Sequence, residues 1–282
     1  MPRTSAAQTQ DVEPAKAEVF ISYIALEQGL AEAIKTCIET AFEGGVAAHA
    51  GTGAAAGDLS GWAERLERRL FKSSVLLVIA SRLSVKSPWV FFETGFATAR
   101  AIKVIPICLP GQAPQSLPVP LVTGDALKLT MTQDFGKQLI GALKGTLGVS
   151  LKRGYKYGKL ISDLRRGLDD LRLKFRLLVA IRDRPRAACT AKRLAPALKS
   201  SASKVGRALS ELDQADYVSS GGLGYLPDDG YSLTERGKEL LRRAGEDDRP
   251  QTSGKEVQRE GDPLPTAGEP APAVRGETTV EK

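Results

Sequence analysis

The chain has 282 residues, of which 42% are hydrophobic and 26% are charged, a globular balance that excludes a fibrous or wholly disordered protein. No apolar run reaches the roughly 18 residues that span a bilayer, and residues 1–16 contain no apolar segment of a secretory signal. Three widely spaced cysteines and a single histidine disfavour a metal site and a disulfide framework. We therefore expect a cytoplasmic protein of two domains that binds no metal and no membrane.

Charge divides the chain into three parts. Residues 1–150 contain 14 Lys or Arg and 13 Asp or Glu, residues 151–245 contain 21 and 11, and residues 246–282 contain 5 and 9. The net charge of +10 in the middle part is typical of a nucleic-acid-binding module, although solvated helices show it too. Residues 1–16 and the acidic, Pro-rich residues 246–282 have too few apolar side chains for a core, so both ends are predicted to be disordered.

Residues 17–150 alternate short apolar strands with helices, which predicts an α/β fold with a flavodoxin-like open parallel sheet. The segments rich in β-branched or uniformly apolar residues are the expected strands: residues 17–23, 44–50, 74–80, 103–109 and 126–130. The segments with apolar positions at helical spacing are the expected helices: residues 26–42, 57–73, 87–102 and 134–147. Of these, the helix at 87–102 should begin with Ser87 as its N-cap and Pro88 at its first position.

The expected binding site lies at one end of this sheet, because ligands of open α/β sheets bind at the carboxyl ends of strands where the strand order reverses. For the order 2-1-3-4-5, that point lies between the loops that follow Tyr23 and Ser81. Glu93 follows Trp89 by four residues, so the carboxylate and the indole share one helix face. An aromatic and an acid near a helix start are often only structural. Here, however, Glu93 stands among phenylalanines, where a carboxylate loses hydration. Such placement is typical of functional residues, so the structural and the functional interpretations of Glu93 have equal weight.

Four sequence blocks in this half resemble the bacterial type of TIR (Toll/interleukin-1 receptor) domain. The blocks are Val19-Phe20-Ile21-Ser22-Tyr23, then S-x-x-L-L-V-I-A-S-R, then Ser87-Pro88-Trp89-x-x-x-Glu93, then Val104-Ile105-Pro106-Ile107. The resemblance covers roughly residues 17–148, within a first domain assigned to residues 17–150. It implies that the domain cleaves the bond between nicotinamide and ribose in NAD+, with Glu93 as the catalytic residue.

One carboxylate suffices for this reaction, because nicotinamide leaves as a neutral ring while positive charge develops on the ribose. Glu93 can stabilise that cation, and Trp89 offers a stacking face to a nucleotide ring. The resemblance places Tyr23 and Ile24 in the substrate pocket. The complete set of residues expected to bind substrate is Ser22, Tyr23, Ile24, Trp62 and Trp89. NAD+ is the substrate in this hypothesis, so no cofactor is expected.

The chain also departs from the family. Ile24-Ala25 stands where some catalytic members carry arginines, and the loop at 51–57 consists of Gly, Ala and Thr without charged residues. Three other interpretations therefore remain open: a non-catalytic TIR adaptor that only recruits other TIR domains, a nucleotide-sensing transcription regulator, and a nucleoside deoxyribosyltransferase-like enzyme. The glycine-rich loop matches a dinucleotide-binding fingerprint only in part, which disfavours a hydride-transfer enzyme.

Residues 151–245 have the order of a small winged-helix α+β domain. Residues 151–185 include a leucine-periodic helix at 155–182, which is a linker, an oligomerisation helix or the first helix of the domain, and Pro185 ends it. Helices at 190–200 and 203–218, a glycine-rich hairpin at 219–233 and a last helix from 234 follow it. The order and the Y-x-L-T-x-x-G motif resemble the winged helix-turn-helix superfamily, here assigned to residues 186–245.

In that superfamily the third helix enters the major groove of DNA. The residues expected at base edges lie at its start: Ser200, Ser201, Ser203, Lys204 and Arg207. The residues expected at phosphates lie just before them: Lys192, Arg193 and Lys199. Many winged helices dock proteins instead, and the basic residues of the last helix, including Arg236 and Arg243, fit a solvated helix end equally well.

Together the two resemblances suggest an NAD+-consuming effector of bacterial anti-phage defence. The TIR resemblance implies a homo-oligomer on activation, and the basic second domain implies a nucleic acid or a regulatory partner.

Overall fold

The computed structural model describes residues 17–42, 45–52, 68–122, 125–220 and 230–245. These residues belong to one compact unit, Met1–Asp248. The second unit, Arg249–Lys282, lies wholly outside the described residues, as do both ends of the chain that were predicted to be disordered.

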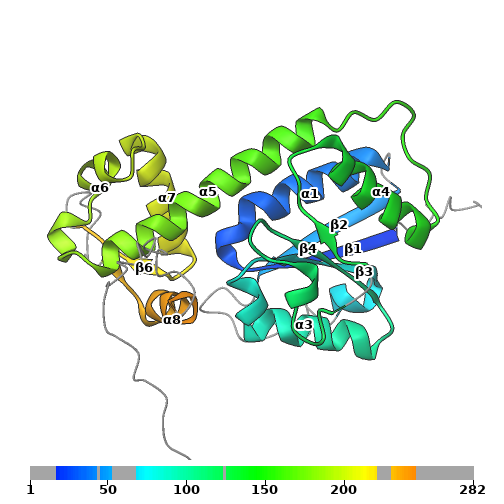
Figure 1. Cartoon of the computed structure of the whole chain (residues 1–282), viewed down its shortest axis with the longest axis horizontal. Coiled ribbons are helices and arrows are strands. Elements are labelled where there is room, and N and C mark those ends of the chain that lie inside the picture. The colour runs from blue at the N-terminus through cyan, green and yellow to red at the C-terminus, as the bar shows by residue number, and fades with distance from the viewer. Residues whose placement is uncertain (1–16, 43–44, 53–67, 123–124, 221–229, 246–282) are drawn as a thin grey trace, which may run out of the picture. The chain divides into compact units, whose positions relative to one another are not determined.

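A five-stranded parallel sheet forms the centre of the first half, with the strand order β2-β1-β3-β4-β5 (Figure 1). The strands are β1 (Ala17–Tyr23), β2 (Val46–Thr52), β3 (Ser73–Ala80), β4 (Lys103–Cys108) and β5 (Leu127–Lys128). The predicted α/β fold, the parallel sheet and the strand order are therefore confirmed. The prediction for β5 was too long, because β4 ends at Cys108 and offers partners only to Leu127 and Lys128.

Helices cover both faces of this sheet. They are α1 (Gln28–Ala41), α3 (Pro88–Ala99) and α4 (Gln133–Leu147), with a short 3-10 turn η1 (Ala25–Glu27) before α1. Ser87 and Pro88 occupy the N-cap and first positions of α3, as predicted, although the Ser87 side chain accepts no capping hydrogen bond. Of the helix predicted at 57–73, only residues 68–73 are described: residues 68–72 are helical, and Ser73 already begins β3. No helix among the described residues is long and apolar enough to cross a membrane.

The second half is mostly helical. Its helices are α5 (Gly158–Arg182), α6 (Ala191–Ala197), α7 (Ala202–Gln214) and α8 (Glu235–Ala244), with a 3-10 turn η4 (Arg186–Ala188) between α5 and α6. Strands β6 (Val218–Ser219) and β7 (Ser232–Leu233) pair in antiparallel fashion, and residues 221–229 of the predicted hairpin lie outside the described residues. Side-chain oxygens of Thr190, Ser201 and Thr234 cap α6, α7 and α8.

Helix α5 packs in both halves of the chain. Its first part contributes Leu160 and Leu164 to the apolar cluster between the sheet, α1 and α4, and its last part contributes Leu177 and Ile181 to the cluster that contains α6 and α7. The backbones of α5 and α1 approach closely at Gly167, where an added Cβ would lie 2.9 Å from the Leu30 nitrogen. A glycine is needed at this contact, so α5 is held against α1 by its shape.

Candidate active site at the carboxyl end of strand β1

The candidate site lies where the strand order reverses, between β1 and β3. The loop after β1 begins with Ile24, and the loop after β3 contains the 3-10 turn η2 (Ser84–Lys86) and leads to Trp89 in α3. A cavity of about 230 Å³ opens between these loops. The residues that line it from the first half are Tyr23, Ile24, Ala25, Leu83, Ser87 and Trp89.

Glu93 lies directly behind this cavity, with no exposed surface. One carboxyl oxygen, Oε1, accepts a hydrogen bond of 2.7 Å from the Trp89 indole nitrogen, and Oε2 has no partner. Burial raises the pKa of Glu93 to about 8, against the opposing effects of the Ser22 hydroxyl and the Trp89 indole. The carboxyl therefore holds its proton at neutral pH in this conformation.

The three predicted residues of the first strand and its loop take different positions around Glu93. Along β1, side chains alternate between the two faces of the sheet, so Ser22 shares the face of Phe20 and points toward α3. Its Oγ is buried beside Glu93 and makes no hydrogen bond of normal geometry. Tyr23 and Ile24 line the cavity, and burial raises the pKa of Tyr23 to about 12, with smaller contributions from the charges of Glu32 and Glu93.

Trp89 separates the cavity from the carboxyl. Its ring is half-buried, stacks on Phe92 with a centroid distance of 5.6 Å, and lines the cavity while its nitrogen binds Glu93. The four-residue spacing thus brings the indole and the carboxyl together, as predicted. Trp62, the other predicted tryptophan, lies outside the described residues, as do residues 53–57 of the glycine-rich loop.

A second buried carboxyl, Glu27, was missed by the sequence analysis. Its side chain has no exposed surface, and its Oε2 accepts a hydrogen bond of 3.1 Å from the Ile24 backbone N–H. Burial raises its pKa to about 7, while the Ser81 and Ser84 hydroxyls and the Ile24 amide act in the opposite direction. Glu27 therefore connects the loop after β1 to the loop after β3. Glu27 follows Ile24, whose backbone is extended, by three residues. This spacing is typical of a capping box and was the available signal for Glu27 in the sequence.

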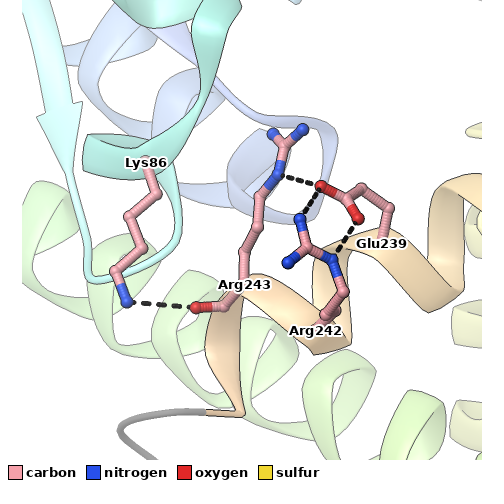
Figure 2. Close-up of polar contacts among 4 residues, drawn as sticks. All are labelled: Lys86, Glu239, Arg242 and Arg243. Carbon is pink, nitrogen blue, oxygen red and sulfur yellow. Dashed lines mark hydrogen bonds and ion pairs between the residues drawn. The ribbon is translucent and has the colours of Figure 1, made fainter.

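The second half of the chain completes the cavity wall. The residues that line it from this half are Tyr217, Arg236, Glu239, Leu240 and Arg243. Lys86 donates a hydrogen bond of 3.0 Å to the backbone carbonyl of Arg243, and the Glu239 carboxylate accepts bonds of 2.7 Å from both Arg242 and Arg243 (Figure 2). Arg236 and Arg243 are thus part of a cavity wall. Their spacing of seven residues on one helix face was the signal for this.

The residues predicted to contact nucleic acid all lie on α6, on the turn after it and on α7. All of them except the half-buried Ser200 are exposed: Lys192, Arg193, Lys199, Ser201, Ser203, Lys204 and Arg207. Ser201 caps α7 by accepting a 3.3 Å bond from the Lys204 N–H, and the Arg193 guanidinium donates a 2.7 Å bond to the Ala187 carbonyl. These two residues therefore have a structural role at this surface as well.

A larger cavity, of about 400 Å³, contains none of the predicted site residues. It lies beside β4 and α5, and its lining is mostly apolar, with Leu109, Leu171 and Phe175 among its residues. No carboxyl lines it. The three cysteines, Cys37, Cys108 and Cys189, are buried and unpaired, as core residues are. Of these two cavities, the smaller one, beside Glu93, is therefore the better candidate for chemistry.

The comparison with protein families identifies a domain in the first half of the chain. The family model described as the TIR domain matches residues 19–140 of the chain. The matched segment contains most of β1 and all of β3 and α3, and hence Ser22, Trp89 and Glu93. A search of curated proteins gave no match to this chain.

Proposed function

Given that residues 19–140 form a TIR domain, we propose that this domain is a NAD+ glycohydrolase, which cleaves the bond between nicotinamide and ribose. One observation carries the proposal. The buried Glu93 carboxyl lies one side chain behind a cavity at the end of β1, with one oxygen bonded to Trp89 and the other unpartnered. A buried oxygen without a partner costs stability, and such groups concentrate where a ligand or a reaction uses them.

In the proposed reaction, the bond between the nicotinamide nitrogen and the ribose C1′ breaks, and its electron pair leaves with nicotinamide. The ring nitrogen, positively charged in NAD+, becomes neutral, so the leaving group needs no acid. A water oxygen adds to C1′, which yields ADP-ribose, nicotinamide and a proton. The ionised Glu93 carboxylate stabilises the positive charge that develops on the ribose, as a carboxylate does in glycoside hydrolysis.

The neighbouring side chains have supporting roles in this proposal. Trp89 orients the Glu93 carboxyl through its indole N–H and offers an aromatic face to the substrate. Tyr23 and Ile24 form the apolar wall against which the nicotinamide ring packs. The Ser22 hydroxyl lies beside Glu93 and has a free hydrogen-bonding capacity that a ribose hydroxyl can use.

A non-catalytic TIR adaptor is the second candidate, and two observations favour it. The cavity of about 230 Å³ lies below the roughly 300–1,000 Å³ of typical small-molecule sites. The loop after β1 carries Ile24 and Ala25, so no cation stands there to bind a diphosphate.

For the second half, we propose a winged helix that binds nucleic acid or a regulatory partner. The order α5, α6, α7, β6, β7, α8 supports this proposal, as does the exposed basic surface of α6 and α7. The role as a bacterial defence effector that assembles into homo-oligomers is proposed from the resemblance to bacterial TIR proteins.

The test is NAD+ consumption by the full-length protein and by Glu93→Gln, with and without single- and double-stranded nucleic acid. The glycohydrolase predicts NAD+ loss that falls at least about 100-fold in Glu93→Gln, because the charge that stabilises the ribose cation is removed. Glu39→Gln, a carboxyl on α1 outside the cavity, serves as the matched control and should keep full activity. NAD+ loss that is equal in Glu93→Gln and wild type would overturn the proposal, and no loss under any condition would favour the adaptor.

A further inference from the structure

One face of α8 forms a wall of the cavity beside Glu93. Arg236, Leu240 and Arg243 lie three or four residues apart, so they share a helix face, and all three line the cavity. Trp89 lines the same cavity from the TIR domain, and Glu93 lies behind it. The α8 face is therefore positioned to control access to the carboxyl.

Two contacts hold this face in place. Helix α8 ends at Ala244, so the Arg243 carbonyl is one of the last carbonyls of the helix, which lack partners within it. The Lys86 ammonium, from the loop after β3, donates to that carbonyl at 3.0 Å (Figure 2), and a cation is favourable at a helix C-terminus. In addition, Leu240 packs against the apolar cluster that includes both Ile24 and Tyr217.

The charges on this face are partly paired within α8. Glu239 also lines the cavity, and its carboxylate accepts hydrogen bonds from both Arg242 and Arg243. These hydrogen bonds lower the pKa of Glu239 to about 2, so it is an anion at neutral pH. The single Glu239 carboxylate therefore offsets one of the two positive charges of Arg242 and Arg243, and its bonds hold both guanidinium groups within α8.

The size and solvation of the site also indicate a closed state. The cavity of about 230 Å³ is smaller than typical small-molecule sites, which span roughly 300–1,000 Å³, and a dinucleotide is a large ligand. Glu93 has no exposed surface. The burial that closes the site also keeps the Glu93 carboxyl protonated at neutral pH, whereas the proposed reaction uses the anion.

We propose that α8 is an autoinhibitory cover: while its Arg236–Arg243 face packs against the TIR domain, NAD+ cannot enter, and release of this face opens the cavity toward Glu93. The identity of the excluded ligand rests on the glycohydrolase proposed above. The cover itself rests on the Lys86 and Leu240 contacts and on the cavity that they close.

The test uses two substitutions in the full-length chain that weaken the contact from opposite sides. Lys86→Met removes the donor to the Arg243 carbonyl, and Leu240→Asp places a charge in the apolar part of the contact. Lys238→Met is the matched control, because Lys238 lies on α8 outside the cavity and pairs with the exposed Glu235. Because one of the two opening substitutions could disturb folding, circular dichroism of each variant accompanies the assay.

Two measurements distinguish the proposal of an autoinhibitory cover from the proposal of a glycohydrolase. The first is NAD+ hydrolysis, expected to rise about tenfold in Leu240→Asp and severalfold in Lys86→Met, to stay unchanged in Lys238→Met and to fall when Glu93→Gln is added. The second is acrylamide quenching of Trp89 fluorescence. The chain has two tryptophans, so it is measured in a Trp62→Phe background, and it is expected to rise about twofold in the opening variants.

Each outcome decides one of the two proposals. Increased quenching with increased hydrolysis supports both. Increased quenching without NAD+ loss in any variant supports the cover and contradicts the glycohydrolase. Hydrolysis by the wild type that stays level or falls in both opening variants overturns the cover, because α8 would then be a wall of the working site. Unchanged quenching in both folded variants also overturns it.

Discussion

The two halves of the chain differ in whether their buried polar groups have hydrogen-bond partners. In the TIR domain, the Ser22 hydroxyl and the Glu27 and Glu93 carboxyls each keep a buried oxygen without a hydrogen-bond partner. In the second half, the buried Lys174 ammonium is bonded twice, to Asp170 at 2.7 Å and to Glu211 at 2.6 Å. Both regions bury groups that can carry charge, so burial alone does not separate a reactive site from a structural contact.

The difference lies in how completely the hydrogen bonds are made. A buried oxygen without a partner costs free energy of folding, whereas the Lys174 bridge satisfies its buried ammonium while it joins α5 to α7. Within the described residues, the unpartnered buried side-chain oxygens all belong to the region where β1 ends and α3 passes. This concentration supports the chemistry proposed for the TIR domain.

The largest expected effect concerns the free energy of unfolding of Glu93→Gln as a function of pH. The pKa of Glu93 is about 8 in the folded protein, well above that of a carboxyl in an unfolded chain, so the folded state keeps a proton that the unfolded state loses. The wild type therefore loses stability as pH rises from about 4.5 to about 8. Gln lacks this proton exchange, so the variant should gain about 2–4 kcal/mol relative to the wild type between pH 5 and pH 8.

Urea unfolding at these two pH values measures the effect. Glu235→Gln is the matched control, because the Glu235 side chain is 90% exposed and is solvated in both states. A difference between wild type and Glu93→Gln that is the same at pH 5 and pH 8 would mean that Glu93 is ionised in the folded protein. The contrast between the two halves would then lose its main support.

A smaller effect is expected at the contact that joins the two halves. In Gly167→Ala, the new methyl group meets the backbone of Leu30 and Gly29 at about 3 Å, so α5 must shift away from α1. Such overpacking costs about 1–3 kcal/mol. Gly141→Ala on α4 is the control, because a Cβ there meets nothing within 4 Å and alanine favours a helix by about 1 kcal/mol. Denaturant unfolding that ranks Gly167→Ala no less stable than Gly141→Ala would show that α5 is not fixed at this contact.

Sequence reasoning located most of the fold because burial leaves a pattern in each segment separately. The uniformly apolar residues 74–80 predicted a strand buried on both faces, and β3 spans Ser73–Ala80 with one exposed residue near its start. The length of β5 was not predictable in this way. It depends on where β4 ends, which is a property of the partner strand and not of residues 126–130.

The candidate site was predictable where its residues lie close together in the sequence. Trp89 and Glu93 are neighbours because they share one helix, so their spacing alone predicts the contact that the structure shows. For Glu27 and the α8 residues, local spacing indicates a position at a helix start or on one helix face, but not a place at this site. Glu27 owes its burial to the loop after β3, more than 50 residues away, and Arg243 reaches the cavity only through contacts between the two halves.

The smallest effect tests whether the second half contacts nucleic acid as well as the TIR domain. Lys192 and Lys199 are exposed on α6 and just after it, where the proposed winged helix meets phosphates. Replacing either lysine by Gln is expected to weaken binding to duplex DNA severalfold. The negative slope of log affinity against log salt concentration should become shallower by about 1, because each phosphate contact releases about one counterion. Lys144→Gln, which replaces an exposed lysine on α4, should leave the slope unchanged.

Fluorescence anisotropy of labelled duplex DNA across salt concentrations measures these slopes. Equal slopes in all three variants would mean that the basic surface is only a solvated face, and the second half would then act on the TIR domain without nucleic acid.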